Sequence, residues 1–171
     1  DKQSLLRQIP FALAKAGEVK QAVEVAQTIE DARTKEYLLI RIALDLVNAE
    51  AFKKAFEVVQ TFENATTKES LLRQIASAQV KALAKAGEFK QAVEVAQTIK
   101  DVIGKESLLR QIASAQLEAG DKQQALETLK QAFEVVQTFE NATAKQSLLR
   151  QIASAQLEAG DKQQALETLK Q

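Results

Sequence analysis

The sequence contains no cysteine, histidine, methionine or tryptophan, and only one proline and five glycines in 171 residues. Without cysteine there are no disulfides or thiolate nucleophiles, and without histidine there are no imidazole bases and few ways to bind zinc. Catalysis would need carboxylate pairs, lysine, serine or the lone Tyr37, and no glycine-rich phosphate loop, nucleophile elbow or calcium loop appears. We therefore expect no enzyme, no cofactor and no metal centre.

The sequence also lacks net charge, since 23 lysines and arginines balance 23 aspartates and glutamates. No long-range attraction draws it to nucleic acid or an anionic membrane. No apolar run approaches the ~20 residues of a membrane helix, and no signal-peptide pattern is present. We expect neither partner, and a soluble cytoplasmic location if the protein is natural. Because the chain begins at Asp1 and contains no methionine, a fragment, a processed product and a designed sequence all stay open.

One short word recurs along the chain. SLLRQ occurs at 4–8, 70–74, 107–111 and 147–151, with the degenerate copy YLLIR at 37–41. A period of this length, carried by helix-forming residues, predicts an all-α solenoid of about five helix-turn-helix repeats. We expect a single array over residues 1–171, with units at 1–36, 37–69, 70–106, 107–146 and 147–171.

Each unit reads as two helices around a tight turn. In the first unit, Leu5, Leu6 and Ile9 recur at helical spacing, Gly17 interrupts, and the spacing then resumes. Gly87, Gly120 and Gly160 mark later turns, whereas the second unit has Asn48-Ala49-Glu50, where we expect the least regular turn. The expected helices are 2–16, 19–30, 34–48, 51–63, 67–86, 89–100, 104–119, 121–142, 144–159 and 161–171.

Two units contain insertions of four and seven residues, close to one and two helical turns. We expect the first helix of the third unit and the second helix of the fourth to be longer than their counterparts and to protrude. Pro10 occupies a position where later units have alanine, and a proline inside a helix removes a hydrogen bond. It predicts a kinked or frayed first helix.

Distant segments are nearly identical. Residues 105–131 and 145–171 differ only in having Glu106 where the second copy has Gln146. Recent duplication explains such copying, and so does deliberate construction.

The segments GEVKQA (17–22), GEFKQA (87–92) and GDKQQA (120–125 and 160–165) resemble the start of the second helix of the tetratricopeptide repeat (TPR). Leu6, Leu39, Leu72, Leu109 and Leu149 fall where that family usually has tryptophan. The sequence departs from the family in lacking this tryptophan and the terminal proline. The resemblance implies a right-handed α-solenoid whose first helices line a groove for peptides or partner helices.

In such proteins a basic and amide-bearing ladder on the first helices binds a peptide carboxylate. The positions that match it here are Arg7, Gln8, Arg41, Arg73, Gln74, Ser77, Arg110, Gln111, Ser114, Arg150 and Gln151. Because arginine pairs well with carboxylates, an acidic peptide is the expected ligand. The alternative is that the arginines recur only because the unit was copied, and are solvated or paired with a neighbouring glutamate. The seven phenylalanines lie at helical spacing and are expected in the core.

The last unit has no polar capping helix, so its apolar side is expected to be open and to favour a homo-oligomer. The sequence thus predicts a non-enzymatic protein or peptide interaction scaffold. The alternative function is that of a designed or idealised repeat protein with no natural ligand.

Overall fold

The computed structural model describes the backbone of residues 2–171 and the side chains from Gln8 onward. Over that range it contains ten helices and no strand, as the sequence predicted. The helices are α1 (Lys2–Lys15), α2 (Val19–Gln27), α3 (Ala32–Asn48), α4 (Phe52–Gln60), α5 (Ala65–Lys85), α6 (Phe89–Gln97), α7 (Val102–Glu118), α8 (Lys122–Gln137), α9 (Ala142–Glu158) and α10 (Lys162–Leu169).

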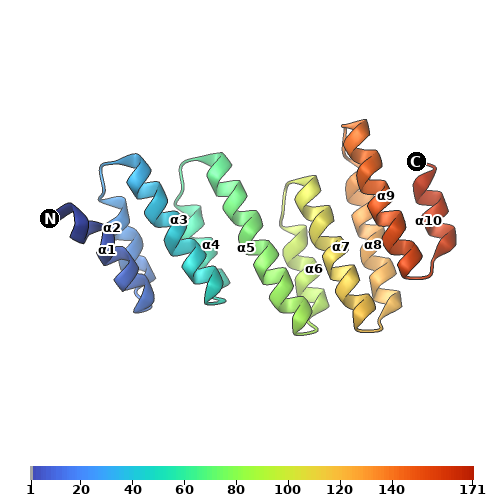
Figure 1. Ribbon diagram of the computed structural model, residues 1–171, viewed down its shortest axis with the longest axis horizontal. Helices are drawn as coiled ribbons and strands as arrows, with labels where there is room; N and C mark the ends of the chain where they lie inside the picture. The colour runs from blue at the N-terminus through green and yellow to red at the C-terminus, as the bar shows by residue number, and fades with distance from the viewer. Residues whose placement is uncertain (1) are drawn as a thin grey trace. The chain divides into compact units, whose positions relative to one another are not determined.

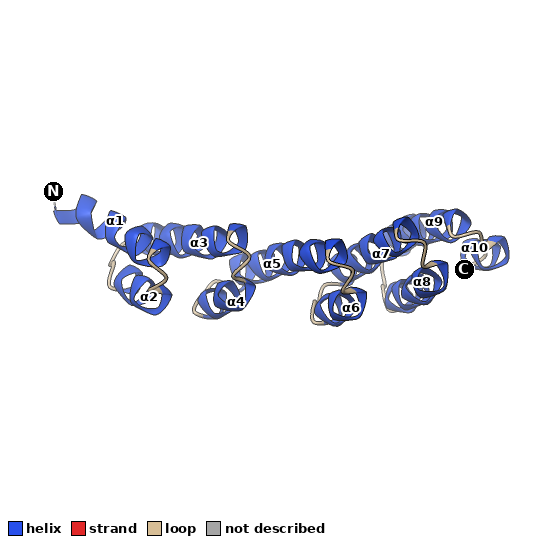
Figure 2. Ribbon diagram, turned by 90° about the horizontal axis from the view of Figure 1, so that it is seen from below, coloured by secondary structure: helices blue, strands red, loops and turns tan. Residues whose placement is uncertain are grey.

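The helices form consecutive hairpins, each of a first helix, a tight turn and a second helix (Figure 1). Two compact units are distinguished, residues 1–75 and 76–171, and the boundary falls inside α5. Within the first unit, α1 and α3 form one layer and α2 and α4 another; within the second, α7 and α9 lie in one layer and α6 and α8 in the other (Figure 2). The chain is therefore an all-α repeat of helical hairpins, in agreement with the sequence prediction.

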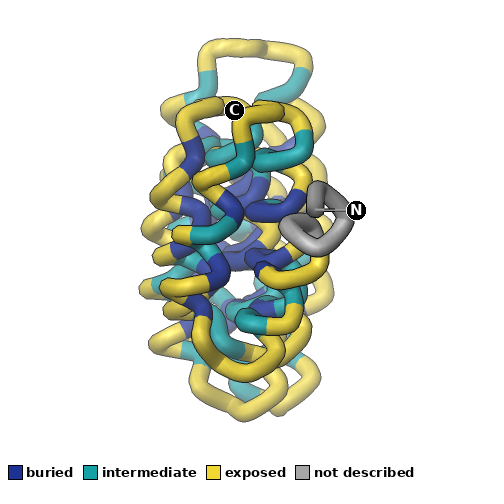
Figure 3. The backbone as a smooth tube through the Cα atoms, turned by 90° about the vertical axis from the view of Figure 1, so that its left-hand side faces the viewer, coloured by how far each residue is buried: buried dark blue, intermediate teal, exposed yellow. Residues whose placement is uncertain are grey.

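The core of each unit lies between its two layers, while the turns are exposed (Figure 3). The repeated leucine and isoleucine of the SLLRQI motif are central to it, since Leu109, Ile112 and Ile152 are fully buried. Small residues of the second helices, such as Ala92 and Ala132, are buried against them. Phenylalanines pack into or against these clusters and so are core residues, as predicted.

Helix lengths confirm the effect of the two insertions. Helix α5 has 21 residues against 17 in α3, α7 and α9, and α8 has 16 against 9 in α2, α4 and α6. The predicted end of α8 at residue 142 is wrong, because the helix stops at Gln137. At 16 residues α8 is nearly as long as its partner α7, which has 17.

Side-chain caps explain where the helices stop and start. Thr138 Oγ1 donates to the Val135 carbonyl, 2.7 Å away, at the end of α8. Asn141 Oδ1 then accepts from the Ala144 amide at 3.0 Å, so the next helix begins there. The same arrangement joins α2 to α3 through Thr28 and Asp31. The first backbone amides of a helix have no partner within it, and an aspartate or asparagine just before the helix accepts hydrogen bonds from them. This explains why most first helices begin two residues earlier than predicted.

The turn of the second unit is not irregular, contrary to the prediction. Glu50 adopts the left-handed conformation (φ 56°) that glycine adopts in the other four turns. Its amide donates to the Val47 carbonyl at 2.9 Å, and the next amide, that of Ala51, reaches Leu46 at 2.8 Å. The Gly87 turn has the same two hydrogen bonds. The second unit thus keeps the backbone conformation of the other turns although it has glutamate in place of glycine, and this conformation strains Glu50.

We expect Glu50→Gly to raise the free energy of unfolding by about 1 kcal/mol, because glycine adopts this conformation without strain and the exposed Glu50 side chain loses no packing. Urea unfolding followed by circular dichroism measures the change. The matched control is Gly87→Ala, expected to lose about 1 kcal/mol, since φ is 78° there and no atom crowds the added methyl. Equal stability of the wild type and Glu50→Gly would contradict the strain.

Pro10 lies inside α1, and the helix continues on both sides of it, from Lys2 to Lys15. The proline side chain is buried, like Ala76, Ala113 and Ala153 at the same position of later units. The proline therefore does not end the helix.

Candidate peptide-binding groove

The structure distributes the predicted groove residues over several environments. The side chain of Arg7 lies outside the described residues. Ser77, Arg110 and Gln111 are half-buried. The remaining positions are exposed: Gln8, Arg41, Arg73, Gln74, Ser114, Arg150 and Gln151. Two of the arginines have partners within the chain that bear on the predicted carboxylate ladder.

Arg41 of α3 is held by two aromatic rings. Its guanidinium lies over the Phe11 ring of α1, 5.0 Å from the centroid, and Nη1 donates to the Tyr37 hydroxyl at 3.2 Å. The hydrogen bond to Tyr37 raises the pKa of Arg41 further, so the group stays charged. An arginine over an aromatic face is a packing arrangement in its own right. Arg41 therefore joins α1 to α3.

Arg110 of α7 is paired with a buried carboxylate. Its Nε donates to Glu106 Oε1 at 3.1 Å, one helical turn away. Glu106 is 1% exposed, and its second oxygen, Oε2, has no hydrogen-bond partner. Burial raises the pKa of Glu106, and Arg110 offsets only part of this effect. The guanidinium of Arg110 is therefore already paired with Glu106 within the chain.

Burial at this repeat position differs between the units. Glu106 is 1% exposed in α7, which packs against the 16-residue α8. In the copied segment, α10 has only eight residues, and Gln146 at the corresponding position of α9 is exposed. Glu36 of α3 is half-buried in the unit with the nine-residue α4, and its Oε1 also lacks a hydrogen-bond partner. Full burial of this position therefore occurs in the unit with the longest second helix.

We expect Glu106→Gln to stabilise the protein at pH 7 by about 1–3 kcal/mol, because the amide is uncharged and so removes the cost of burying a carboxylate, which Arg110 only partly offsets. A raised pKa means that the folded state binds the proton more tightly than the unfolded state. The penalty is therefore absent below the ordinary glutamate pKa and complete above the raised one. The gain should disappear near pH ~4.

Urea unfolding at the two pH values measures this difference. The control is Glu69→Gln, at the same repeat position in α5 but exposed, which should change stability little at either pH. A gain of equal size at both pH values would show that the charge of Glu106 is not the cause.

A groove opens between the C-terminal half of α5 and α7. It encloses about 590 Å³, and two predicted residues, Gln111 and Ser114, line it. Gln111 Nε2 also contacts Ser107 Oγ, at 3.3 Å. The other lining residues are Val80, Lys81, Ala84, Lys85, Gly87, Phe89, Ala115, Glu118 and Ala119. We refer to this cavity as the α5–α7 groove.

Lys81 and Lys85 are the groove residues that the sequence prediction missed. Both are exposed, and both lie in the longest helix, α5. The 17-residue helices α7 and α9 have Gln-Leu-Glu-Ala-Gly where α5 has Gln-Val-Lys-Ala-Leu-Ala-Lys-Ala-Gly. Lys85 belongs to the segment Ala-Leu-Ala-Lys-Ala-Gly, which the first unit also has at 12–17, whereas the first unit has Phe11 in place of Lys81. The sequence prediction considered the added length of α5 and not the charge of these two lysines.

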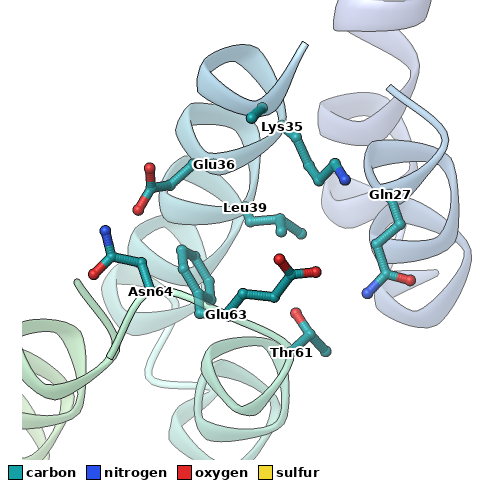
Figure 4. A pocket seen from close by; sticks show the side chains of 9 residues that line it. Gln27, Lys35, Glu36, Leu39, Thr61, Glu63 and Asn64 are labelled. Atoms are coloured by element: carbon teal, nitrogen blue, oxygen red, sulfur yellow. The ribbon is translucent and has the colours of Figure 1, made fainter. Parts of the chain in front are cut away.

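A second cavity of about 540 Å³ lies in the first unit, between the end of α2, the start of α3 and the segment after α4. Lys35 extends toward Gln27 on one side of Leu39, and Glu36 and Asn64 lie on the other side (Figure 4). Glu63 also lines the cavity. With one lysine and two glutamates, its charge favours no one class of ligand, and it contains none of the predicted groove residues.

No protein-family model and no curated protein sequence matches the chain. The chain does resemble several solved structures. One is a protein of Podosopora anserina described as a kinesin light chain with nearly identical TPR-like repeats, at 15% identity and a TM-score of 0.41, covering 99% of this chain and 92% of that one. Another is MamA of strain AMB-1, at 17% identity and a TM-score of 0.40, covering 99% and 88%.

A third is Ton1535 of Thermococcus onnurineus NA1, at 22% identity and a TM-score of 0.41, covering 97% of this chain and 51% of that one.

The part of the chain that the structure describes contains no group of three or more acidic side chains placed to hold a metal ion. None of its helices combines the length and the apolar character needed to cross a bilayer.

Proposed function

We propose that the chain is a non-enzymatic interaction scaffold that binds an acidic peptide in the α5–α7 groove. The observation that carries this proposal is the combination of an apolar floor with two lysines at the rim. Such a site suits an extended segment that carries an aliphatic or aromatic side chain next to a carboxylate.

The floor is formed by short and aromatic apolar residues. Val80 is buried, and Ala84, Phe89 and Ala115 are half-buried. Backbone can approach closely over alanine, and the exposed part of Phe89 offers area for an apolar side chain. The floor supports affinity for a peptide of mixed character.

The charged residues at the rim give the groove a net positive charge. Lys81 and Lys85 lie one turn apart on α5, and Glu118 of α7 is the only acidic residue among the lining residues of the groove that the structure describes. Gln111 and Ser114 add an amide and a hydroxyl on the α7 side. This balance favours carboxylates over ammonium groups.

The chemistry of the groove supports binding without catalysis. Ser114 has no histidine to accept its proton, because the chain contains none.

An array of acidic peptides with one aliphatic or aromatic residue, followed by fluorescence anisotropy on the best binder, tests the proposal. The double variant Lys81→Glu/Lys85→Glu should weaken binding at least ~10-fold, since two attractive contacts become repulsive. The control is Lys122→Glu/Lys130→Glu on α8, which changes net charge equally at exposed positions outside the groove. Equal losses in both variants would indicate attraction by overall charge only.

Substituting the lysine pair tests peptide binding more cleanly than substituting the arginines. Replacing Arg110 by glutamate would place a second carboxylate beside the buried Glu106 and disturb the fold. If no peptide of the array binds at all, the alternative of an idealised repeat protein without a natural ligand is favoured.

A further inference from the structure

Two nearly identical segments of this chain have different environments. In residues 105–131, Leu129 is fully buried, and Leu117 and Leu126 are half-buried. In the copy, residues 145–171, the corresponding Leu169, Leu166 and Leu157 are 52%, 60% and 50% exposed. Since the segments differ at one position only, the difference comes from what covers them.

The cover of the first segment is helix α9. Ala155 of α9 packs with Leu117 against the cluster of Ala113, Ala125 and Leu129. No helix in the described part of the chain covers the matching face of α9 and α10, whose three large apolar side chains remain exposed. We call these residues, Leu157, Leu166 and Leu169, the open face.

A helix able to cover the open face is present at the other end of the chain. Residues 2–9 of α1 have the same sequence, KQSLLRQI, as residues 145–152 of α9. One turn further on, Ala12 stands where α9 has Ala155, and it is exposed. Ile9 is 41% exposed, although the matching Ile152 is fully buried.

We propose that the open face binds α1 of a second copy of this chain, head to tail, in the way that α9 covers α7 and α8. The contact would bury the three leucines of the open face against the side of α1 that presents Ile9 and Ala12. It uses a surface separate from the α5–α7 groove and so does not depend on the proposed peptide binding.

A head-to-tail contact leaves one free end at each side of a dimer, so association continues unless the array closes into a ring. The expected signature is a mass that rises with protein concentration without stopping at two chains. Sedimentation velocity on the full chain, from micromolar to millimolar concentration, measures it.

Two variants block one end each. Leu169→Glu blocks the open face and Ala12→Glu blocks α1, and circular dichroism checks that both remain helical. Each alone should associate at least ~10-fold more weakly than the wild type, because the contact loses a buried leucine or gains a buried charge. Mixed in equal amounts, they should form a discrete dimer through their two intact ends. Gln163→Glu on α10, an exposed polar position, is the control and should behave as the wild type.

Three outcomes would overturn the proposal. The first is a wild type that stays monomeric at millimolar concentration. The second is dimerisation of Ala12→Glu alone, which would indicate a tail-to-tail contact. The third is an equal mixture of the two variants that stays monomeric. If Leu169→Glu loses its helical signal, Leu166→Glu takes its place, because Leu166 is the most exposed residue of the open face.

Discussion

Ile112→Ala should lower the free energy of unfolding by about 2–5 kcal/mol, the largest effect that we expect from a single truncation. Ile112 is fully buried in α7, in the cluster that contains Leu109, Ala132 and Val136. Removing its methyl groups leaves a cavity that the surrounding helices cannot fill without moving, so the lost packing adds to the lost burial.

The repeat supplies the control for this prediction. Ile9→Ala makes the same truncation at the corresponding position of α1, where the side chain is 41% exposed, and should cost about 1 kcal/mol or less. Urea unfolding gives both values. Because repeat arrays can unfold in parts, hydrogen exchange of the peptides that cover α7 adds a local readout. Equal losses at the two positions would show that Ile9 is buried in solution.

The repeat and its packing residues were predictable because they depend on local periodicity. The second to fifth units bury the same leucine (Leu38, Leu71, Leu108 and Leu148) and isoleucine (Ile42, Ile75, Ile112 and Ile152), and spacing alone identifies them. Helix ends were less predictable, since the stop of α8 depends on Thr138 and Asn141, whose capping bonds compete with continued apolar spacing through Phe139. The Glu50 turn was misjudged because the two backbone hydrogen bonds from the amides of Glu50 and Ala51 outweigh one unfavourable φ angle.

The charged residues were harder to place because their environment depends on other helices. Glu106 lies at the same repeat position as Glu36 and Glu69, yet Glu106 is fully buried, Glu36 is half-buried and Glu69 is exposed. The burial of Glu106 in turn recruits Arg110, which the sequence had suggested for a ligand. The insertion in α5 was visible in the sequence, but the position of Lys81 beside α7 requires the packed structure. The position of a charged residue in the repeat therefore does not by itself give its environment.

Ala113→Pro should destabilise the chain by about 3 kcal/mol or more. In an α-helix the amide of residue 113 pairs with the carbonyl of residue 109, and a proline both removes that donor and collides with that carbonyl. Ala113 is fully buried against Ala125 and Leu129, so α7 cannot bend there without opening this cluster. Ala113→Gly separates the contributions, since it keeps the amide and should lose only about 1 kcal/mol.

Pro10 allows the reverse experiment at the same repeat position. Pro10→Ala restores the missing donor in α1 and should raise both the helical signal at 222 nm and the stability, by up to about 3 kcal/mol. Thermal and urea unfolding of the three variants, side by side with the wild type, should rank Pro10→Ala first, the wild type second, Ala113→Gly third and Ala113→Pro last. An unchanged signal in Pro10→Ala would mean that α1 does not continue through residue 10 in solution. In that case Pro10 would not stand within a continuous helix, whereas the proline of Ala113→Pro would interrupt one. The stability lost in Ala113→Pro would then measure what a continuous α7 contributes to the array.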